Sequence, residues 1–272
     1  MALRHIIFLL FPALLILAAC SSSNTDVQQE LPAEELYQRA SQALDRRNYV
    51  EATRFFEEVE RQHPYSEWAT RAQLMAAFSS YQGQSYDEAV IALDRFIQLH
   101  PGHKDIAYAH YLRALCFYEQ ISDVRRDQQF TIEALNALDG VVKRFPDTEY
   151  ARDASLKMDL ALDHLAGKEM EVGRYYLNRG HINAAINRFR TVVTNYQTTT
   201  HVAEALHRLV EAYVTLGLKD EAYRVAAVLG YNYPGSDWYQ RSYALMDPQQ
   251  RERIISERGI VARTIDTIFK PD

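Results

Sequence analysis

Cysteine is almost absent from this sequence. Of its 272 residues only Cys20 and Cys116 are cysteine, and Cys20 lies at the end of an apolar N-terminal run. If the thiol of Cys20 is consumed in another reaction, Cys116 has no partner for an internal disulfide. The fold then has to be held by the packing of side chains. Cys116 lies in the apolar stretch from Tyr111 to Tyr118. There we predict a small buried side chain rather than a nucleophile.

Motifs for catalysis, metal binding and phosphate binding are also missing. The sequence has no nucleophile elbow, no glycine-rich phosphate loop and no pair of cysteines at ligand spacing. His100 and His103 flank Pro101 and Gly102, but no carboxylate or cysteine motif joins them. A histidine at a helix end can bond free carbonyl groups instead. We therefore expect no enzyme activity, no metal ion and no cofactor.

An excess of positive charge is lacking as well. The formal net charge is −6, which makes nucleic acid an improbable partner and predicts that none is bound. After the N-terminal run, no second apolar run is long enough to span a bilayer. Tyrosine, by contrast, is abundant, with 18 residues. Because tyrosine can be apolar and hydrated at once, this abundance favours a protein-recognition surface.

The N-terminal apolar run extends from Ile6 to Ala19 and follows Arg4. A short run behind a basic residue is typical of a secretory signal peptide. Its end, Leu17-Ala18-Ala19-Cys20, resembles the lipobox of bacterial lipoproteins. The resemblance implies that residues 1–19 are removed and that Cys20 carries a covalent lipid. The alternative is an ordinary signal peptide followed by a chance cysteine.

The residues after the lipobox indicate the target membrane and the tether that would connect the folded part of the chain to the lipid. Ser21 follows the cysteine, and by resemblance to lipoprotein sorting a serine here implies the outer membrane. Residues 20–32 are mostly polar and are predicted to form a lipidated, flexible tether. Each buried methylene adds about 0.8 kcal/mol, so two or more acyl chains anchor a protein stably.

A repeating pattern occupies the rest of the chain. In five segments an alanine is followed by apolar residues four and seven positions later, and four of the five segments have a proline at position twelve. Offsets of zero, four and seven lie on one face of a helix. A small residue lets a neighbouring helix approach, and proline ends the helix. We therefore predict five antiparallel helical hairpins, whose alanines are Ala52, Ala89, Ala134, Ala185 and Ala222.

The pattern also predicts where helices begin and end. The first hairpin should comprise residues 33–46 and 49–62, with a break at Asn48, and the second residues 68–82 and 86–99, with a break at Gly83. In four of the five units, a hydroxyl residue two positions after the residue that ends the second helix is a predicted N-cap. These are Ser66, Thr148, Thr199 and Ser236.

Two units are longer than the others. In the third unit, residues 121–128 are polar and charged, which predicts a loop at the edge of the array. In the fourth, the first helix is predicted to run from Tyr150 to Arg179 and to end at Gly180, projecting beyond its neighbours. Residues 247–272 place isoleucine and valine between arginines. This tail is either a cap over the last apolar face or a partner-binding helix.

The predicted fold class is therefore all-α, a superhelical array of about five hairpins over residues 33–246. The units resemble tetratricopeptide repeats, although their anchors are 37, 45, 51 and 37 residues apart and that repeat has about 34 residues. Such an array has one specialised surface, since its first helices line a concave groove suited to extended segments of other proteins.

The lipobox, the tether and the five units together resemble the BamD family, lipoprotein subunits of the machinery that assembles β-barrel proteins in the outer membrane. Three stretches add to the resemblance: Asp94–Ile97 before His100, Arg125–Gln129, and Tyr175–Tyr176 with Arg179–Gly180. The resemblance implies a non-enzymatic scaffold at the periplasmic face. It also implies binding to the periplasmic domain of the barrel subunit BamA, to other lipoproteins of the complex, and to the C-terminal signal of unfolded outer-membrane proteins.

Candidate binding residues follow from these expectations. Tyr37, Tyr81 and Tyr111 lie on predicted first helices and are our candidates for holding the client peptide. Further groove candidates are Tyr108, Arg113 and Tyr118. For the BamA side, the candidates near the fourth hairpin turn are Arg179, Arg188 and Arg190.

Two other functions remain open from the sequence. One is an envelope tetratricopeptide lipoprotein that serves as an adaptor and recruits peptidoglycan enzymes or a protease. The other is an enzyme whose active site would lie within the array, although no residue pattern in the sequence indicates one. Accumulation of unfolded barrel proteins on depletion would separate the assembly function from both.

Overall fold

The structure is a computed structural model that describes residues 30–246 and 248–249. The predicted signal peptide 1–19, the lipidation site Cys20, Ser21 and nearly all of the tether lie outside the described residues, as does the tail apart from residues 248–249. Within the described ranges every regular element is a helix. None of these helices is both long enough and apolar enough to cross a membrane.

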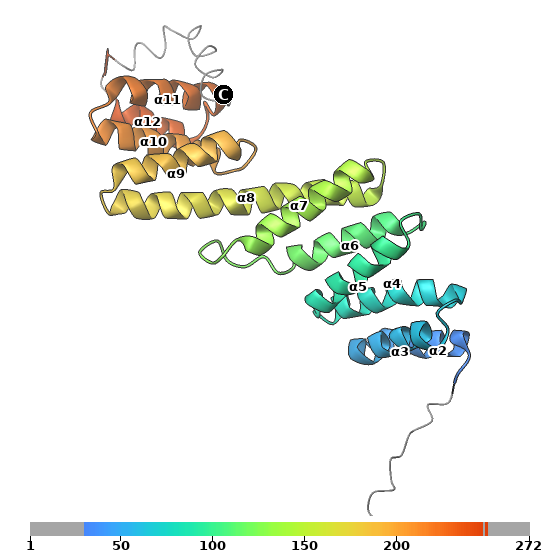
Figure 1. The fold of residues 1–272 in the computed structure, drawn as a ribbon. Coiled ribbons are helices and arrows are strands. Elements are labelled where there is room, and N and C mark those ends of the chain that lie inside the picture. Colours follow the sequence, from blue (N-terminus) through green and yellow to red (C-terminus); the bar gives the residue numbers. More distant parts are fainter. Residues whose placement is uncertain (1–29, 247, 250–272) are drawn as a thin grey trace, which may run out of the picture.

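The helices follow one another as antiparallel pairs, stacked along an elongated molecule (Figure 1). This confirms the predicted all-α array of hairpins. The elements are α2 (Ala33–Asp45), α3 (Tyr49–Gln62), α4 (Glu67–Gln82), α5 (Tyr86–Leu99), α6 (Ile106–Tyr118), α7 (Gln129–Arg144), α8 (Glu149–Asn178), α9 (Ile182–Asn195), α10 (Val202–Thr215), α11 (Lys219–Asn232) and α12 (Asp237–Leu245).

The core is built from the repeated positions that the sequence revealed. In the first unit Ala52, Phe56 and Val59 are 0% exposed. All five anchor alanines and the apolar residues four and seven positions after them are at most 1% exposed. A small side chain at the first position therefore sits in the helix contact, and the two larger ones fill the space beside it. The repeat pattern was correctly interpreted as a packing pattern.

Four of the five turns inside the hairpins share one geometry, and the longer α6–α7 loop is the exception. Each of the four contains a residue in the left-handed region, namely Arg47, Gln84, Gly180 and Gly217, with φ between 59 and 76°. The amide of the next residue then bonds back into the helix, as Asn48 N does to Ala43 O at 2.9 Å. Gly83 keeps φ −78°, so the left-handed residue is Gln84 and not the glycine.

Three of the four predicted N-caps are confirmed and one is wrong. The hydroxyls of Ser66, Thr148 and Ser236 each accept a hydrogen bond from the backbone amide three residues later. Thr199 does not cap α10, which begins at Val202 after N-cap His201. The neighbouring Thr200 is bound to α8 instead, since Asp163 Oδ1 accepts from the amide of Thr200 at 2.9 Å and from its hydroxyl at 2.7 Å.

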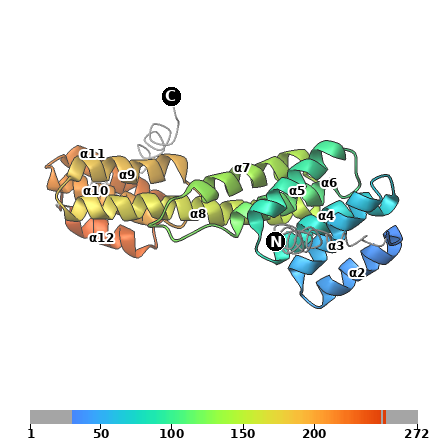
Figure 2. The same ribbon diagram turned by 60° about the horizontal axis from the view of Figure 1, so that its bottom comes forward.

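Helix α8 joins two halves of the array. With 30 residues it is the longest described helix, and it extends beyond α7 as predicted. The extra length is not exposed, however. Ala151 and Ala154 are buried in its first half, which packs on α6 and α7, and Met170 and Gly173 in its second half, which packs on α9. We call α2–α7 the N-terminal half and α9–α12 the C-terminal half (Figure 2).

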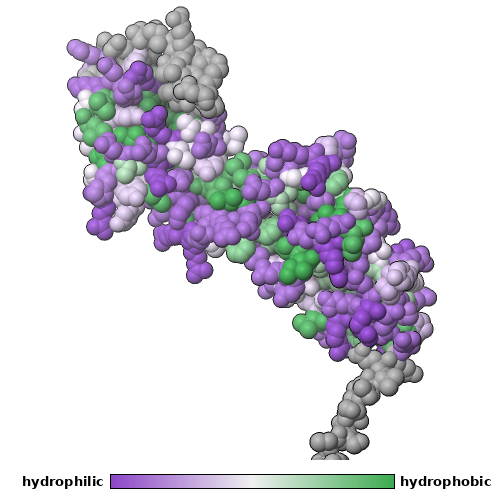
Figure 3. Space-filling model, viewed as in Figure 1, coloured by the Kyte–Doolittle hydropathy of each residue, from purple (hydrophilic) through white to green (hydrophobic). Residues whose placement is uncertain are grey.

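The first helices of successive hairpins touch one another. Contacts join α2 to α4, α4 to α6, α6 to α8, and α10 to α12. This row of first helices forms what we call the inner surface, as expected for an array of this kind. The second helices α3, α5 and α7 lie outside it. The face seen in Figure 3 is mostly hydrophilic, with apolar patches between the polar areas.

Candidate protein-interaction site

The three tyrosines predicted to hold a peptide each reach from one first helix to the next. The ring of Tyr37 on α2 lies 5.0 Å from Trp68 on α4 and 5.2 Å from Phe56 on α3. The hydroxyl of Tyr81 on α4 donates to Glu119 Oε1 at 3.4 Å, at the end of α6. All three rings are half-buried. They therefore join neighbouring units and stay only partly exposed to a ligand.

Tyr111 makes the closest of these connections. Its ring stacks on Tyr150 at 5.4 Å, and its hydroxyl donates to a carboxylate oxygen of Asp153 on α8. Burial, with this hydrogen bond second, raises the pKa of Tyr111. The same bond, helped by Lys157, lowers the pKa of Asp153. At neutral pH the pair is thus a neutral phenol donating to a carboxylate, a strong form of hydrogen bond.

The remaining candidates on α6 point in different directions. Tyr108 packs its ring 5.6 Å from Tyr150, and burial raises the pKa of Tyr108 to about 12. Lys157 Nζ lies 5.5 Å from the centre of the Tyr118 ring. Arg113 Nε instead pairs with Asp94 Oδ1 of α5 at 2.5 Å. Arg113 therefore turns toward a second helix, away from the row of first helices.

The sequence interpretation missed two exposed leucines beside these tyrosines. Leu156 and Leu160 on α8 are 66% and 60% exposed. Because they are four residues apart, they lie together on one face of the helix, next to the face whose Asp153 receives Tyr111. Their spacing opposite the buried alanines of α8 was the available signal. We call Leu156 and Leu160 the leucine strip.

A hollow continues from the leucine strip. It has a volume of about 520 Å³, and Leu160 lies in its wall. The loop after α6 contributes Ile121 and Val124, and the start of α10 contributes His201. His201 Nε2 lies 3.5 Å from Asp163 Oδ2. The hollow thus lies where both halves meet α8, with an apolar wall and a polar rim.

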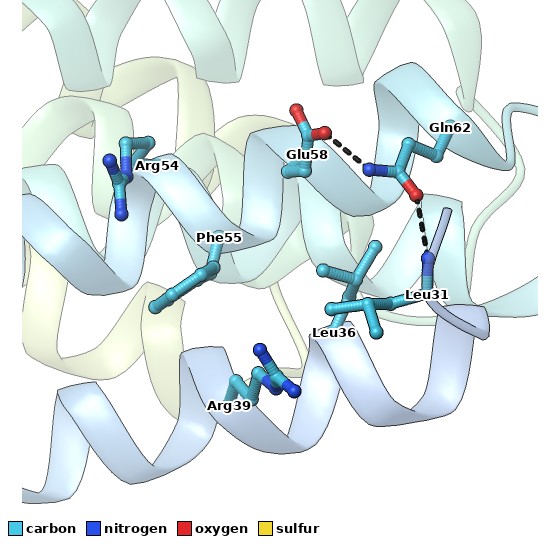
Figure 4. Close-up of a pocket in the computed structure, with 7 residues that line it drawn as sticks. All are labelled: Leu31, Leu36, Arg39, Arg54, Phe55, Glu58 and Gln62. Carbon is cyan, nitrogen blue, oxygen red and sulfur yellow. Dashed lines mark hydrogen bonds between the residues drawn. The ribbon is translucent and has the colours of Figure 1, made fainter. Parts of the chain in front are cut away.

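A second hollow of about 300 Å³ lies at the first hairpin (Figure 4). Figure 4 shows α2 and α3 facing each other across it, with Leu36 and Phe55 as apolar walls. Arg39 is paired with Glu35 at 2.7 Å, and Arg54 lies 5.2 Å from the centre of the Phe55 ring. The amide of Leu31 donates to Gln62 Oε1 at 3.2 Å, which closes one end.

The three arginines proposed for the BamA side do not form one cluster. Arg179 follows α8 and stacks over Tyr175 at 5.5 Å, and Tyr175 is 57% exposed. Arg188 Nη1 pairs with Glu169 Oε2 of α8 at 3.1 Å. Arg190 is exposed two residues further along α9, on another face of the helix. Arg179 with Tyr175 is the pair best placed to meet a partner.

Ion pairs join α8 to α10 beside their shared apolar core. Arg174 of α8 pairs with Glu171 at 3.1 Å and with Glu204 of α10 at 3.2 Å. Arg208 continues the series, pairing with Glu204 at 3.3 Å and Glu211 at 2.9 Å. The inner surface is therefore aromatic and aliphatic in the N-terminal half and ionic where the C-terminal half begins.

Groups with catalytic or metal-binding potential are sparse in the described part of the chain. Cys116 is fully buried, and burial raises the pKa of its thiol to about 12. His100 and His103 lie against Phe96 at 5.1 and 5.3 Å, which is a packing role. Among the described residues, no three histidines, cysteines or carboxylates are grouped to hold a metal. The absence of metal and cofactor in the whole protein remains a prediction.

Comparison with known protein families agrees with this geometry. The YfiO family, described as outer membrane lipoprotein, matches residues 29–229, which cover the array from before α2 into α11. The chain belongs to this family. The match confirms the resemblance that the lipobox and the repeats suggested. Family membership also associates the protein with the outer membrane.

Several curated relatives carry the name outer membrane protein assembly factor BamD. The relative from Caulobacter vibrioides is 54% identical over 230 residues, covering 85% of this chain and 75% of the relative. That from Rickettsia prowazekii is 48% identical over 236 residues, covering 87% and 94%. That from Neisseria meningitidis serogroup A is 34% identical over 244 residues, covering 84% and 91%. The YfiO family is thus the family of these BamD proteins.

Proposed function

We propose that this protein is a lipid-anchored scaffold of the machinery that assembles β-barrel proteins in the outer membrane. It would work at the periplasmic face, held by a lipid on Cys20, and would act by binding rather than by catalysis. Its partners would be the periplasmic domain of BamA, other lipoproteins of the complex, and unfolded outer-membrane proteins. Family membership and the exposed inner surface of a helical array support this function.

The observation that carries the client-binding part is the leucine strip beside the tyrosines. Leu156 and Leu160 are more than half exposed, and soluble surfaces expose neighbouring large apolar side chains mainly where they bind something. We propose that a client segment lies along this surface and contacts the exposed parts of the Tyr37, Tyr81 and Tyr111 rings. An apolar side chain of the segment would then enter the hollow next to Leu160.

Peptide binding tests the client surface. The probe is a fluorescent synthetic peptide with the C-terminal strand sequence of an outer-membrane barrel protein, titrated with the full chain. The double variant L156D/L160D is expected to weaken binding by about tenfold, because it removes apolar contact area and adds charge. The matched control V50D/I91D alters two aliphatic residues on second helices that are 81% and 71% exposed. Equal affinity for both variants would exclude the leucine strip.

The BamA side is tested separately. We propose that Arg179, Arg188 and Arg190 contact the periplasmic domain of BamA, with Arg179 most accessible. R179E is expected to reduce recovery of BamA from detergent extracts, whereas R46E, a change in an exposed turn of the first hairpin, should not. If single alanine substitutions at these three arginines and at Tyr37, Tyr81 and Tyr111 leave both binding events unchanged, the assignment of both surfaces is wrong.

The adaptor function gives a different result in a mild-detergent pull-down. The full chain carries a C-terminal tag, and C20S serves as the control that lacks the lipid. Recovery of a large outer-membrane barrel protein with periplasmic repeats supports the assembly function. Recovery of peptidoglycan enzymes or a protease without that barrel would replace it with the adaptor function.

A further inference from the structure

The loop between α6 and α7 contributes Ile121 and Val124 to the hollow beside Leu160, but its other residues have no part in the function proposed above. Residues 119–128, here called the brace loop, lie against the middle of α8, where the two halves of the array meet (Figure 1). The contact is close, since a Cβ atom on Gly167 of α8 would lie 3.4 Å from Val124 Cγ1. This ten-residue loop packs where the two halves meet and is longer than most connections between packed helices. Loops of such length often have a function.

The backbone of the brace loop is held by side chains. Lys168 Nζ of α8 donates to the carbonyl oxygens of Arg125 and Arg126 at 3.1 and 3.3 Å. Gln128 Nε2 donates to the same Arg126 carbonyl at 3.1 Å, and its Oε1 accepts from Thr131 Oγ1 at 2.9 Å. His164 Nδ1 lies 2.9 Å from that oxygen. The loop is therefore ordered before any partner arrives, which lowers the entropic cost of binding.

The arginine side chains of the loop are left largely unused by these contacts. The Arg125 side chain is 77% exposed, and its nearest carboxylate, Glu171 Oε1, lies 3.6 Å from Nε. Arg126 is exposed, and among the residues that the structure describes no carboxylate lies at ion-pair distance from it. A guanidinium without a carboxylate partner can bind one from another molecule in a forked geometry.

An open hollow of about 720 Å³ adjoins these arginines. Its wall contains Ile132 of α7, which is 50% exposed, and Lys168 of α8. Asp127 and Glu133 also line it, but Asp127 Oδ1 caps the Gln129 amide at 2.8 Å, and Glu133 Oε1 accepts from Gln129 Nε2 at 2.8 Å. The hollow therefore presents three cationic side chains, those of Arg125, Arg126 and Lys168, and two hydrogen-bonded carboxylates around one aliphatic residue.

We propose that the brace loop and this hollow form a docking site for an acidic segment of a partner protein. Carboxylates of that segment would pair with Arg125 and Arg126, and an aliphatic side chain would cover Ile132. A uniformly anionic lipid surface fits less well, because Asp127, Glu133 and the nearby Glu171 would repel it. Discrete carboxylates on a folded or extended segment can lie between them.

Photo-crosslinking from the hollow tests this site. The probe is p-benzoyl-phenylalanine in place of Ile132, in the full lipidated chain within cell envelopes. We expect a crosslink to one protein segment with at least two carboxylates near the attachment point. R125E/R126E should reduce its yield about tenfold, whereas R46E/R47E, the same change at exposed arginines in the α2–α3 turn, should not. Lysine substitutions of the carboxylates in the partner segment should restore the crosslink to R125E/R126E.

Four results would overturn the proposal: crosslinks to lipid, crosslinks only within this chain, a partner segment without carboxylates, or a yield unaffected by R125E/R126E. Helical content and thermal unfolding of each variant show whether the array is intact. If R125E/R126E does not fold, R126A replaces it, because Arg126 has no ion pair to lose among the described residues. An unchanged yield in a folded R126A protein then also counts against the site.

Discussion

Residues on the inner surface have one of two roles: some join neighbouring helices, and others are exposed and available for binding. Tyr37, Tyr81 and Tyr111 join successive first helices, so their removal should cost stability as well as binding. Leu156 and Leu160 are exposed and join nothing. The leucines therefore allow binding to be tested without unfolding the array, whereas the tyrosines require changes that keep the ring.

Tyr111→Phe keeps the ring and removes the hydroxyl that donates to Asp153. We expect a loss of about 0.5–1 kcal/mol in unfolding free energy at pH 7, less than is typical of a buried bond to a charged group, because the Asp153 side chain is 44% exposed. The bond lowers the pKa of Asp153 below its usual 3.8. Its contribution is thus complete above that value and is lost as pH falls through the lowered pKa.

Urea denaturation from pH 7 down to pH 3 measures this effect. The difference between wild type and Tyr111→Phe should shrink as pH falls. Tyr108→Phe is the control, since the Tyr108 hydroxyl makes no hydrogen bond within the described residues. A loss for Tyr111→Phe that stays constant with pH would show that the hydrogen bond is not to a titrating carboxylate.

Cys116 gives a second prediction for a single residue. Its side chain is 0% exposed, and burial raises the pKa of its thiol to about 12, so almost no thiolate exists at pH 8. In a C20S chain, where Cys116 is the only cysteine, alkylation by iodoacetamide should be very slow until denaturant unfolds the protein. Fast labelling of the native chain would mean that the core around α6 opens readily.

Helix contacts in this array depend on small residues at particular points. A Cβ atom on Gly173 of α8 would lie 2.5 Å from Cε1 of Phe189, one of the buried residues of α9. Gly140 of α7 has open space at the same position. The two glycines are both inside helices, yet only Gly173 is needed for a helix crossing.

Gly173→Ala is therefore expected to destabilise the protein by about 1–3 kcal/mol, because the Phe189 ring has to move in a filled core. Gly140→Ala should stabilise it by up to about 1 kcal/mol, through the higher helix propensity of alanine. Thermal unfolding of the two variants checks the contrast. A neutral Gly173→Ala would mean that α8 and α9 are farther apart than described.

Helix α8 joins two halves of the molecule whose clusters of buried residues differ in size. The N-terminal half has three small clusters of buried residues, one for each hairpin. In the C-terminal half one cluster of 20 buried residues runs from α8 through α12. In a repeat protein each unit is stabilised mainly by its neighbours, so a terminal unit with a small cluster is the weakest part.

Hydrogen exchange should reveal this difference. Amides of α2 and α3 are expected to exchange faster than those of α9 and α10, since opening the first hairpin breaks only one small cluster. Mass spectrometry of deuterated peptides from the two halves measures it. Equal protection in both halves would indicate that the array unfolds as a single cooperative unit.

The sequence by itself determined the repeated hairpins. Alanine, apolar residues and proline at fixed offsets are local features, because one helix face and one helix end depend on residues a few positions apart. The lipobox is equally local and gives the prediction of a lipid on Cys20, which stays a prediction, and the resemblance to the family followed from both. The buried anchors and three of four N-caps agree with these local rules.

Only the tertiary structure decided how the units meet. Helix α8 buries one face in its first half and another in its second, and Asp163 reaches across to Thr200, next to the expected cap at Thr199. The same holds for Tyr111 with Asp153 and for the leucine strip. Each depends on which side chains from helices far apart in sequence reach a given face, or leave it uncovered, and a periodic pattern shows which face is apolar without showing what covers it.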